Sequence, residues 1–162
     1  MRTATTLVLA AALAVPGCVQ RSIAEVDTGT IEVMSWRATL SRPATADSLD
    51  APINLAGSVA VRPATNPSQS QATILLSNAT PSAVHPWHIH AGSCGTDGGI
   101  VGPATSYVPL TVGADGKAEV SVTLPFSTPT QGEFFVNVHK SPAELGTIIA
   151  CGPLSMGISP MQ

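Results

Sequence analysis

The stretch His85-Pro-Trp-His-Ile-His-Ala-Gly-Ser-Cys94 holds three of the four histidines and one of the three cysteines of this 162-residue chain. In an extended segment, side chains two residues apart stand on the same face, so His88 and His90 point the same way with their Cα atoms about 7 Å apart. Two imidazoles placed in this way can converge on one metal ion. The alternative is a strand face with two surface or hydrogen-bonded histidines, and the rest of the chain bears on that choice.

The composition favours a mostly β protein of one domain. The chain is 44% hydrophobic and only 10% charged, and its length allows it to bury a substantial core. Thr, Val, Ser, Gly and Pro are abundant, which suits short strands joined by tight turns. The net charge of -3, the pI near 5.7 and the absence of any Lys/Arg cluster argue against a nucleic-acid partner.

Apolar and β-branched runs bounded by Gly, Pro, Asn and Asp predict about seven or eight short strands. The predicted strands cover residues 30–40, 55–61, 71–77, the histidine stretch, 107–112, 117–124, 133–139 and 147–151. The turn Ala114-Asp-Gly116 predicts a hairpin between 107–112 and 117–124. So many short, turn-separated strands predict an antiparallel sandwich or barrel.

The N-terminal residues are expected to direct export. Arg2 precedes an apolar run at residues 3–15 that is too short to span a membrane comfortably and has the length of a signal-peptide apolar region. Val15-Pro-Gly-Cys18 looks like a bacterial lipobox, in which Cys18 becomes the lipidated first residue of the mature protein. Pro16 departs from the usual residue there and leaves ordinary cleavage nearby open. The expected division is a signal peptide at 1–17, a tether at 18–29 and a β-sandwich domain at 30–162.

The cysteine count fits a lipoprotein. If Cys18 carries lipid, Cys94 and Cys151 remain as one pair, which an oxidising compartment would close. This bridge would close a loop of more than fifty residues. The chain-entropy model gives such a loop a stabilisation of up to about 4 kcal/mol.

Several segments resemble the copper-zinc superoxide dismutase family. The segment His85–His90 is similar to the family signature His-Gly-Phe-His-Val-His, and Cys94 follows where the family has a disulfide cysteine. Val136-Asn-Val-His139 resembles the later strand that carries another copper histidine, and Ile149-Ala-Cys-Gly-Pro153 resembles the terminal Ala-Cys-Gly. The resemblance covers about residues 54–154 in the family's order. It implies an antiparallel Greek-key β-sandwich.

The resemblance assigns roles to single residues. It implies that His88, His90 and His139 are copper ligands and that Cys94 and Cys151 form the intrasubunit disulfide. His85 matches a histidine that ties down the loop beside the copper without ligating it, and such a support holds ligand rings in one tautomer and orientation.

Three nearby aromatic residues are expected to pack and not to take part in the site. Trp87 lies on the opposite strand face from the ligands and is expected in the core. Of Phe134 and Phe135, one is expected in the core as well.

The chain also departs from the family pattern. The family normally has a copper-zinc bridging histidine, further zinc histidines and an aspartate in the loop after the first disulfide cysteine. Residues 95–106 contain no histidine, and Asp97 alone cannot make a tetrahedral zinc site, so zinc is expected to be absent. Ile148 stands where the family places an arginine that guides superoxide, and the second active-site loop is shortened to residues 140–147. Lys140 is a candidate source of positive charge, although a lysine after a strand end is usually just solvated.

Three neutral histidines without thiolates favour copper, here one ion per chain, over manganese or iron. Met34, Met156 and Met161 are potential soft ligands for copper(I), although isolated methionines more often fill gaps in packing.

The expected partners are superoxide or copper ions, and a membrane that the protein binds through its lipid anchor. Three functions stay open. The first is a copper-only superoxide dismutase, against which the missing arginine and bridging histidine count. The second is a module that stores, buffers or delivers copper at the cell envelope. The third is a structural surface lipoprotein with a vestigial site, against which the retained histidines count.

Overall fold

The computed structural model describes residues 32–44, 46 and 50–160. These residues form nine β-strands and one turn of 3-10 helix, η1 (Ala104–Ser106). The strands are β1 (Glu32–Ser41), β2 (Ala56–Pro63), β3 (Ser70–Ser77), β4 (Val84–His85), β5 (Trp87–Ala91), β6 (Leu110–Thr111), β7 (Ala118–Leu124), β8 (Phe134–His139) and β9 (Ile148–Pro160). In this part of the chain, no helix is long and apolar enough to cross a membrane. The described chain is therefore all-β, as its composition predicts.

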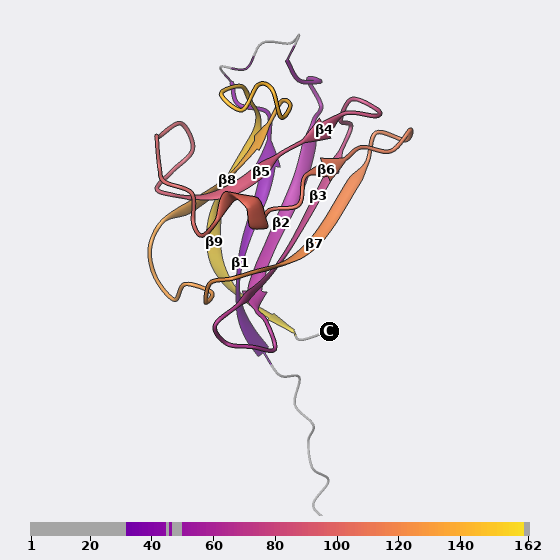
Figure 1. Ribbon diagram of the computed structural model, residues 1–162. Helices are drawn as coiled ribbons and strands as arrows, with labels where there is room; N and C mark the ends of the chain where they lie inside the picture. Colours follow the sequence, from indigo (N-terminus) through magenta and orange to yellow (C-terminus); the bar gives the residue numbers. More distant parts are fainter. Residues whose placement is uncertain (1–31, 45, 47–49, 161–162) are drawn as a thin grey trace, which may run out of the picture.

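Seven strands form one antiparallel sheet in the order β5-β8-β9-β1-β2-β3-β7. The sheet is strongly twisted and curled (Figure 1). The other two strands, β4 and β6, pair with each other. Because β3 and β7 lie at one end of the sheet and β5 and β8 at the other, the chain crosses the molecule between β3 and β5 and again between β7 and β8.

The core lies on one face of the curled sheet. Along β1, Trp36, Ala38 and Leu40 are buried whereas Arg37 and Thr39 are exposed, the period of two that a half-buried strand requires. The ring of Trp36 meets Phe134 edge to face at 5.3 Å between centroids. The largest fully buried side chains are Trp87, Phe135, Leu40, Ile74, Leu110, Leu124 and Ile149.

The predicted hairpin between residues 107–112 and 117–124 is wrong in its pairing. Its turn is present, since the Gly113 amide donates to the Lys117 carbonyl at 2.8 Å. The two arms nevertheless join different ladders, because β6 pairs with β4 and β7 pairs with β3. Pro109 explains the short first arm, because a proline has no amide hydrogen to donate to a ladder.

The last strand is much longer than predicted. The sequence pattern predicts a strand at 147–151, whereas β9 runs from Ile148 to Pro160. It pairs with β8 as far as Leu154 and with β1 as far as Glu32. Pairing on both sides extends the strand beyond the apolar run that is visible in the sequence.

Two packing predictions are confirmed, and one set of predictions lies outside the described residues. Trp87 is fully buried in the core, and Phe135 is buried while Phe134 is only partly so.

The predicted signal peptide at 1–17, the tether at 18–29 and the lipidation site Cys18 fall in the undescribed segment.

Candidate metal centre

Two neighbouring strands bring three histidines together. His88 and His90 lie on β5, where alternation puts them on the face opposite Trp87. The adjacent strand β8 ends at His139, whose amide donates to the Pro86 carbonyl at 2.8 Å. His88, His90 and His139 each offer a ring nitrogen, and these three nitrogens lie within 4.8 Å of one another. The prediction that these residues share one place in the fold is confirmed, and we call them the three-histidine group.

Backbone carbonyls fix the tautomers of two of these rings. His90 Nδ1 lies 2.7 Å from the Gly98 carbonyl, and His139 Nδ1 lies 2.5 Å from the Leu145 carbonyl. Because a carbonyl only accepts hydrogen bonds, both Nδ1 atoms carry the hydrogen. The Nε2 atoms of His90 and His139 therefore present lone pairs.

Those lone pairs face the centre of the group. His88 Nδ1 lies 3.0 Å from His139 Nε2, and because Nε2 is the acceptor, the His88 nitrogen is the donor. Within the described part of the chain, His90 Nε2 is buried without a hydrogen-bond partner. A buried imidazole lone pair without a partner is costly, and a metal ion is one group that satisfies it. The residues present thus fit a metal ion bound through His88 Nδ1, His90 Nε2 and His139 Nε2.

The environment of the group lowers the pKa of two of its rings. Burial, followed by the neighbouring His139 and His90, lowers the pKa of His88 from 6.5 to about 4. Burial also lowers the pKa of His139, partly opposed by its hydrogen bond to the Leu145 carbonyl. Since a metal binds the neutral imidazole, both rings have the charge that binding requires at neutral pH, and the hydrogen on His88 Nδ1 has still to move before that atom can coordinate.

The lowered pKa of His88 predicts a pH effect on the metal-free protein. Folded His88 should titrate near pH 4, whereas the ring in the urea-unfolded chain should titrate near 6.5. Between these values the unfolded state binds the proton and the folded state does not, so the free energy of unfolding should decrease as the pH falls from about 6.5 to 4. Nitrogen NMR of the imidazoles and urea titrations measure both quantities. A His88 midpoint near 6.5 in the folded protein would contradict the expectation.

His85 lies beside the three-histidine group and is not a member of it. This buried ring uses Nδ1 to contact the carbonyls of His139 at 3.1 Å and Lys140 at 2.8 Å. It therefore holds the backbone directly behind a candidate ligand. Its supporting role in metal binding stays a prediction.

The predicted disulfide between Cys94 and Cys151 is present, with 6.1 Å between the Cα atoms. Cys151 lies on β9, opposite Asn137 of β8. Cys94 lies in the loop of residues 92–99 that follows β5, which we call the disulfide loop. The bridge thus ties this loop to the sheet beside the strand that carries His139.

Gly98 of the disulfide loop must be glycine to reach the site. Its carbonyl accepts the hydrogen bond from His90, and the loop folds back so closely that a Cβ at this position would lie 1.7 Å from the Ala91 oxygen. No side chain fits there without moving the backbone. This role could not be predicted from the sequence, because the group that acts is a backbone carbonyl.

Tyr107 is a second neighbour that sequence reasoning missed. Its ring meets that of His88 edge to face at 5.3 Å between centroids, and its hydroxyl donates to the Val101 carbonyl at 2.6 Å. Burial raises the pKa of Tyr107 to about 12, so the phenol stays protonated. Asp97, in contrast, is exposed and is not part of the three-histidine group.

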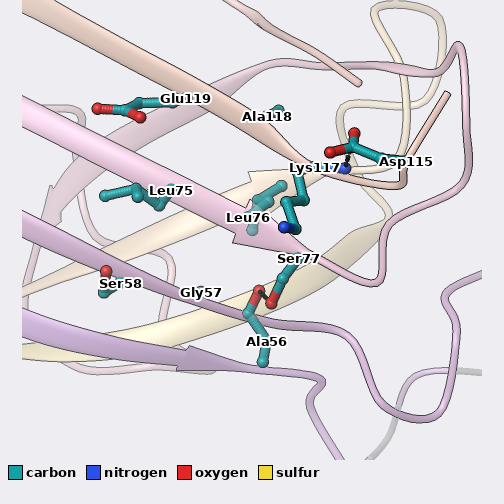
Figure 2. A pocket seen from close by; sticks show the side chains of 10 residues that line it. All are labelled: Ala56, Gly57, Ser58, Leu75, Leu76, Ser77, Asp115, Lys117, Ala118 and Glu119. Atoms are coloured by element: carbon teal, nitrogen blue, oxygen red, sulfur yellow. Dashed lines mark hydrogen bonds between the residues drawn. The ribbon is translucent and has the colours of Figure 1, made fainter. Parts of the chain in front are cut away.

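A groove on the sheet lies away from the histidines. It has a volume of about 500 Å³ and runs over β2, β3 and the start of β7 (Figure 2). Small side chains line it together with Leu75, Lys117 and Glu119, and no histidine is among them. The candidate chemistry therefore belongs to the three-histidine group and not to this groove.

Comparisons with protein-family models and with curated proteins assign the chain to no family. No protein-family model matches the chain, and no curated protein matches it. The argument for function therefore rests on the residues of the site.

Proposed function

We propose that this protein is a superoxide dismutase-like, copper-binding protein of the cell envelope that holds one copper ion per chain. The observation that carries the proposal is the convergence of three histidine nitrogens within 4.8 Å. Two of the three rings have their tautomers fixed by carbonyls, which leaves Nε2 available to a metal. One of those Nε2 atoms, that of His90, is buried and has no hydrogen-bond partner among the residues that the structure describes.

The chemistry of the donors supports copper as the metal. The group offers imidazole nitrogens only, since the nearby Cys94 and Cys151 are joined in a disulfide. Copper(II) binds such a site more tightly than the other divalent metals of the first transition row, zinc included. When bound, copper supplies one-electron chemistry between its two oxidation states.

The fold and the order of motifs support the family assignment within this proposal. Four features agree with the resemblance to copper-zinc superoxide dismutases. They are the antiparallel sheet, two candidate ligand histidines on one strand, a third on the neighbouring strand, and the bridge from the disulfide loop to the last strand. On this reading the two long crossings of the chain make a Greek-key sandwich.

An exported location is part of the same proposal. A disulfide is compatible with an oxidising compartment. The apolar N-terminal run and the lipobox-like Val15-Pro-Gly-Cys18 favour a signal peptide and a lipid anchor on Cys18. The anchor would hold the β domain at the membrane surface.

Copper uptake by the purified, disulfide-bonded protein tests the proposal. At neutral pH the protein should retain one copper per chain after dialysis and no stoichiometric zinc, because the donors are three neutral imidazoles. Metal analysis by mass spectrometry and competition with a chelator of known affinity measure both. Preference for zinc would contradict the choice of copper. Failure to retain any copper would contradict the proposal and leave the structural lipoprotein as the better description.

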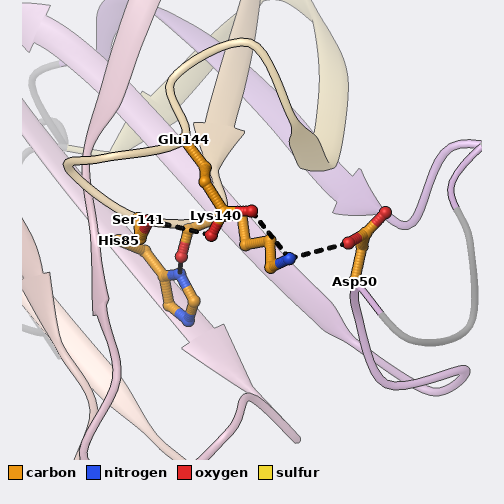
Figure 3. A network of polar contacts seen from close by, with 5 residues as sticks. All are labelled: Asp50, His85, Lys140, Ser141 and Glu144. Atoms are coloured by element: carbon orange, nitrogen blue, oxygen red, sulfur yellow. Dashed lines mark hydrogen bonds and ion pairs between the residues drawn. The ribbon is translucent and has the colours of Figure 1, made fainter.

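Superoxide dismutation is the second candidate, and the resemblance favours it. The charges near the site favour it less. Lys140, proposed as a source of positive charge, forms ion pairs of 2.9 Å with both Asp50 and Glu144 (Figure 3). The hydrogen bonds to Glu144 and Asp50 raise the pKa of Lys140, so it stays charged, but two carboxylates outnumber its single ammonium. This excess of negative charge does not attract the superoxide anion. We therefore expect slow dismutation, or copper storage and delivery without turnover.

An arginine at position 148 should separate these candidates. Ile148 lies opposite His139 in the β8–β9 register, so Ile148→Arg places a cation beside the site. If the copper-loaded wild type dismutates superoxide, the variant should be about 10-fold faster at low ionic strength, and the gain should shrink above about 0.1 M salt. Ile148→Gln is the neutral control and should show no salt-dependent gain. Tight copper binding without turnover in all three proteins would favour the storage or delivery module.

A further inference from the structure

One loop supplies backbone contacts to two histidines. The β8–β9 loop, residues 140–147, connects His139 to the start of β9. Its Lys140 carbonyl accepts from His85 Nδ1 at 2.8 Å, and its Leu145 carbonyl accepts from His139 Nδ1 at 2.5 Å. The orientation of the candidate ligand His139 thus depends on where this loop holds Leu145.

Apolar packing does not hold the tip of the β8–β9 loop. The side chain of Leu145 is 48% exposed, and a Cβ added to the next residue, Gly146, would meet no atom within 4 Å. The loop is held by polar contacts instead. Its backbone hydrogen bonds are Lys140 N to Thr147 O at 2.9 Å, Glu144 N to Ser141 O at 3.0 Å and Thr147 N to Glu144 O at 3.1 Å.

The Lys140 ammonium adds one contact within the loop and one contact between the loop and the connection from β1 to β2. Within the loop it contacts Glu144 Oε1 at 2.9 Å, and outside the loop it contacts Asp50 Oδ1 at 2.9 Å. Asp50 precedes Lys140 by 90 residues and comes from the connection between β1 and β2. Glu144 also accepts a hydrogen bond from Ser141 Oγ at 3.3 Å. Figure 3 shows Lys140 between the two carboxylates, on the loop that also contacts His85.

We propose that Lys140, clamped between Asp50 and Glu144, is a positioning residue that holds the Leu145 carbonyl on His139 Nδ1 and so keeps His139 Nε2 facing the metal. This inference rests on the proposed copper binding, and it gives Lys140 a role other than attracting superoxide. Loss of a hydrogen-bonding support of a metal-ligating histidine typically weakens metal binding by about 10- to 100-fold. Exposed ion pairs contribute little to global stability. The role therefore predicts a large effect on the metal site and a small one on folding.

The substitution Lys140→Met tests the clamp, because it removes the charge and keeps an unbranched side chain. It should weaken copper(II) binding by about 10- to 100-fold and leave the urea midpoint of the metal-free protein nearly unchanged. Lys117→Met, which changes the chain's other lysine on the turn before β7, should alter neither quantity. Lys140→Arg, which keeps the cation, should restore most of the affinity.

A measurement on the metal-free protein separates this inference from the proposed function. Nitrogen NMR should show His139 in the Nδ1-protonated tautomer in the wild type and a tautomer mixture in Lys140→Met. If the wild type binds no copper but the tautomer responds in this way, the positioning role stands and the copper proposal fails. If the tautomer and the copper affinity of Lys140→Met both equal those of the wild type, the positioning role is overturned. A fall in affinity matched by an equal fall in unfolding free energy would also overturn it, because the clamp would then only support the fold.

Discussion

Replacing any one ligand of the three-histidine group by alanine should weaken copper(II) binding by more than about 100-fold. Removal of a direct ligand should exceed the 10- to 100-fold effect of losing a residue that only supports one. His88→Ala, His90→Ala and His139→Ala should each show the loss, because the three nitrogens lie within 4.8 Å of one another. Chelator competition at neutral pH measures the affinities, and circular dichroism verifies that each variant folds.

Methionine variants provide the matched control for the histidine variants. Met34 and Met156 are 52% and 37% exposed and lie on β1 and β9. Met156 follows Ile148, the residue opposite His139, by eight positions, which corresponds to about 26 Å along a strand. Met34→Leu and Met156→Leu should therefore leave copper(II) affinity unchanged. Wild-type affinity in all three histidine variants, or loss of affinity in the methionine variants, would place the metal elsewhere.

Removing the disulfide should have the largest effect on stability. The bridge joins residues 57 positions apart, and the chain-entropy model gives a closed loop of that length about 4 kcal/mol. The double variant Cys94→Ser/Cys151→Ser should lose about that much unfolding free energy in urea. It should also bind copper more weakly, because the disulfide loop carries the Gly98 carbonyl that orients His90.

Reduction of the wild type is the control for the disulfide variant. With a reductant present, the unfolding curve of the wild type should move to that of the double variant, whose own curve should not move. A difference of less than about 1 kcal/mol between oxidised and reduced wild type would contradict the chain-entropy argument, since the constraint on the unfolded chain would then contribute little.

Much of the fold could be predicted because strand residues alternate. The burial of Trp87, one residue before His88, follows from side chains that point to opposite faces in turn. The alternation does not say which strands pair. That is why residues 107–112 and 117–124 were expected to pair, whereas the structure assigns them to different ladders.

The side chains of the candidate site could be predicted better than its supports. His88 and His90 share a strand face by their spacing, and the position of His139 followed from a resemblance of motifs. The carbonyls of Gly98 and Leu145 leave no trace in the sequence, because every residue has a carbonyl and only the folded path directs one to a ring. The contact of Lys140 with Asp50 spans 90 residues, a separation that no local pattern encodes.

The hydrogen bond from His88 Nδ1 to His139 Nε2 has a consequence for the kinetics of metal uptake. In the metal-free protein this single bond occupies two of the three candidate nitrogens, and the third, His90 Nε2, makes no hydrogen bond to any residue in the described ranges. An incoming ion would therefore meet His90 first. The proton on His88 Nδ1 must then leave or transfer to the other ring nitrogen before that residue can coordinate. Association should accordingly proceed in two phases, the slower of which carries a solvent deuterium isotope effect.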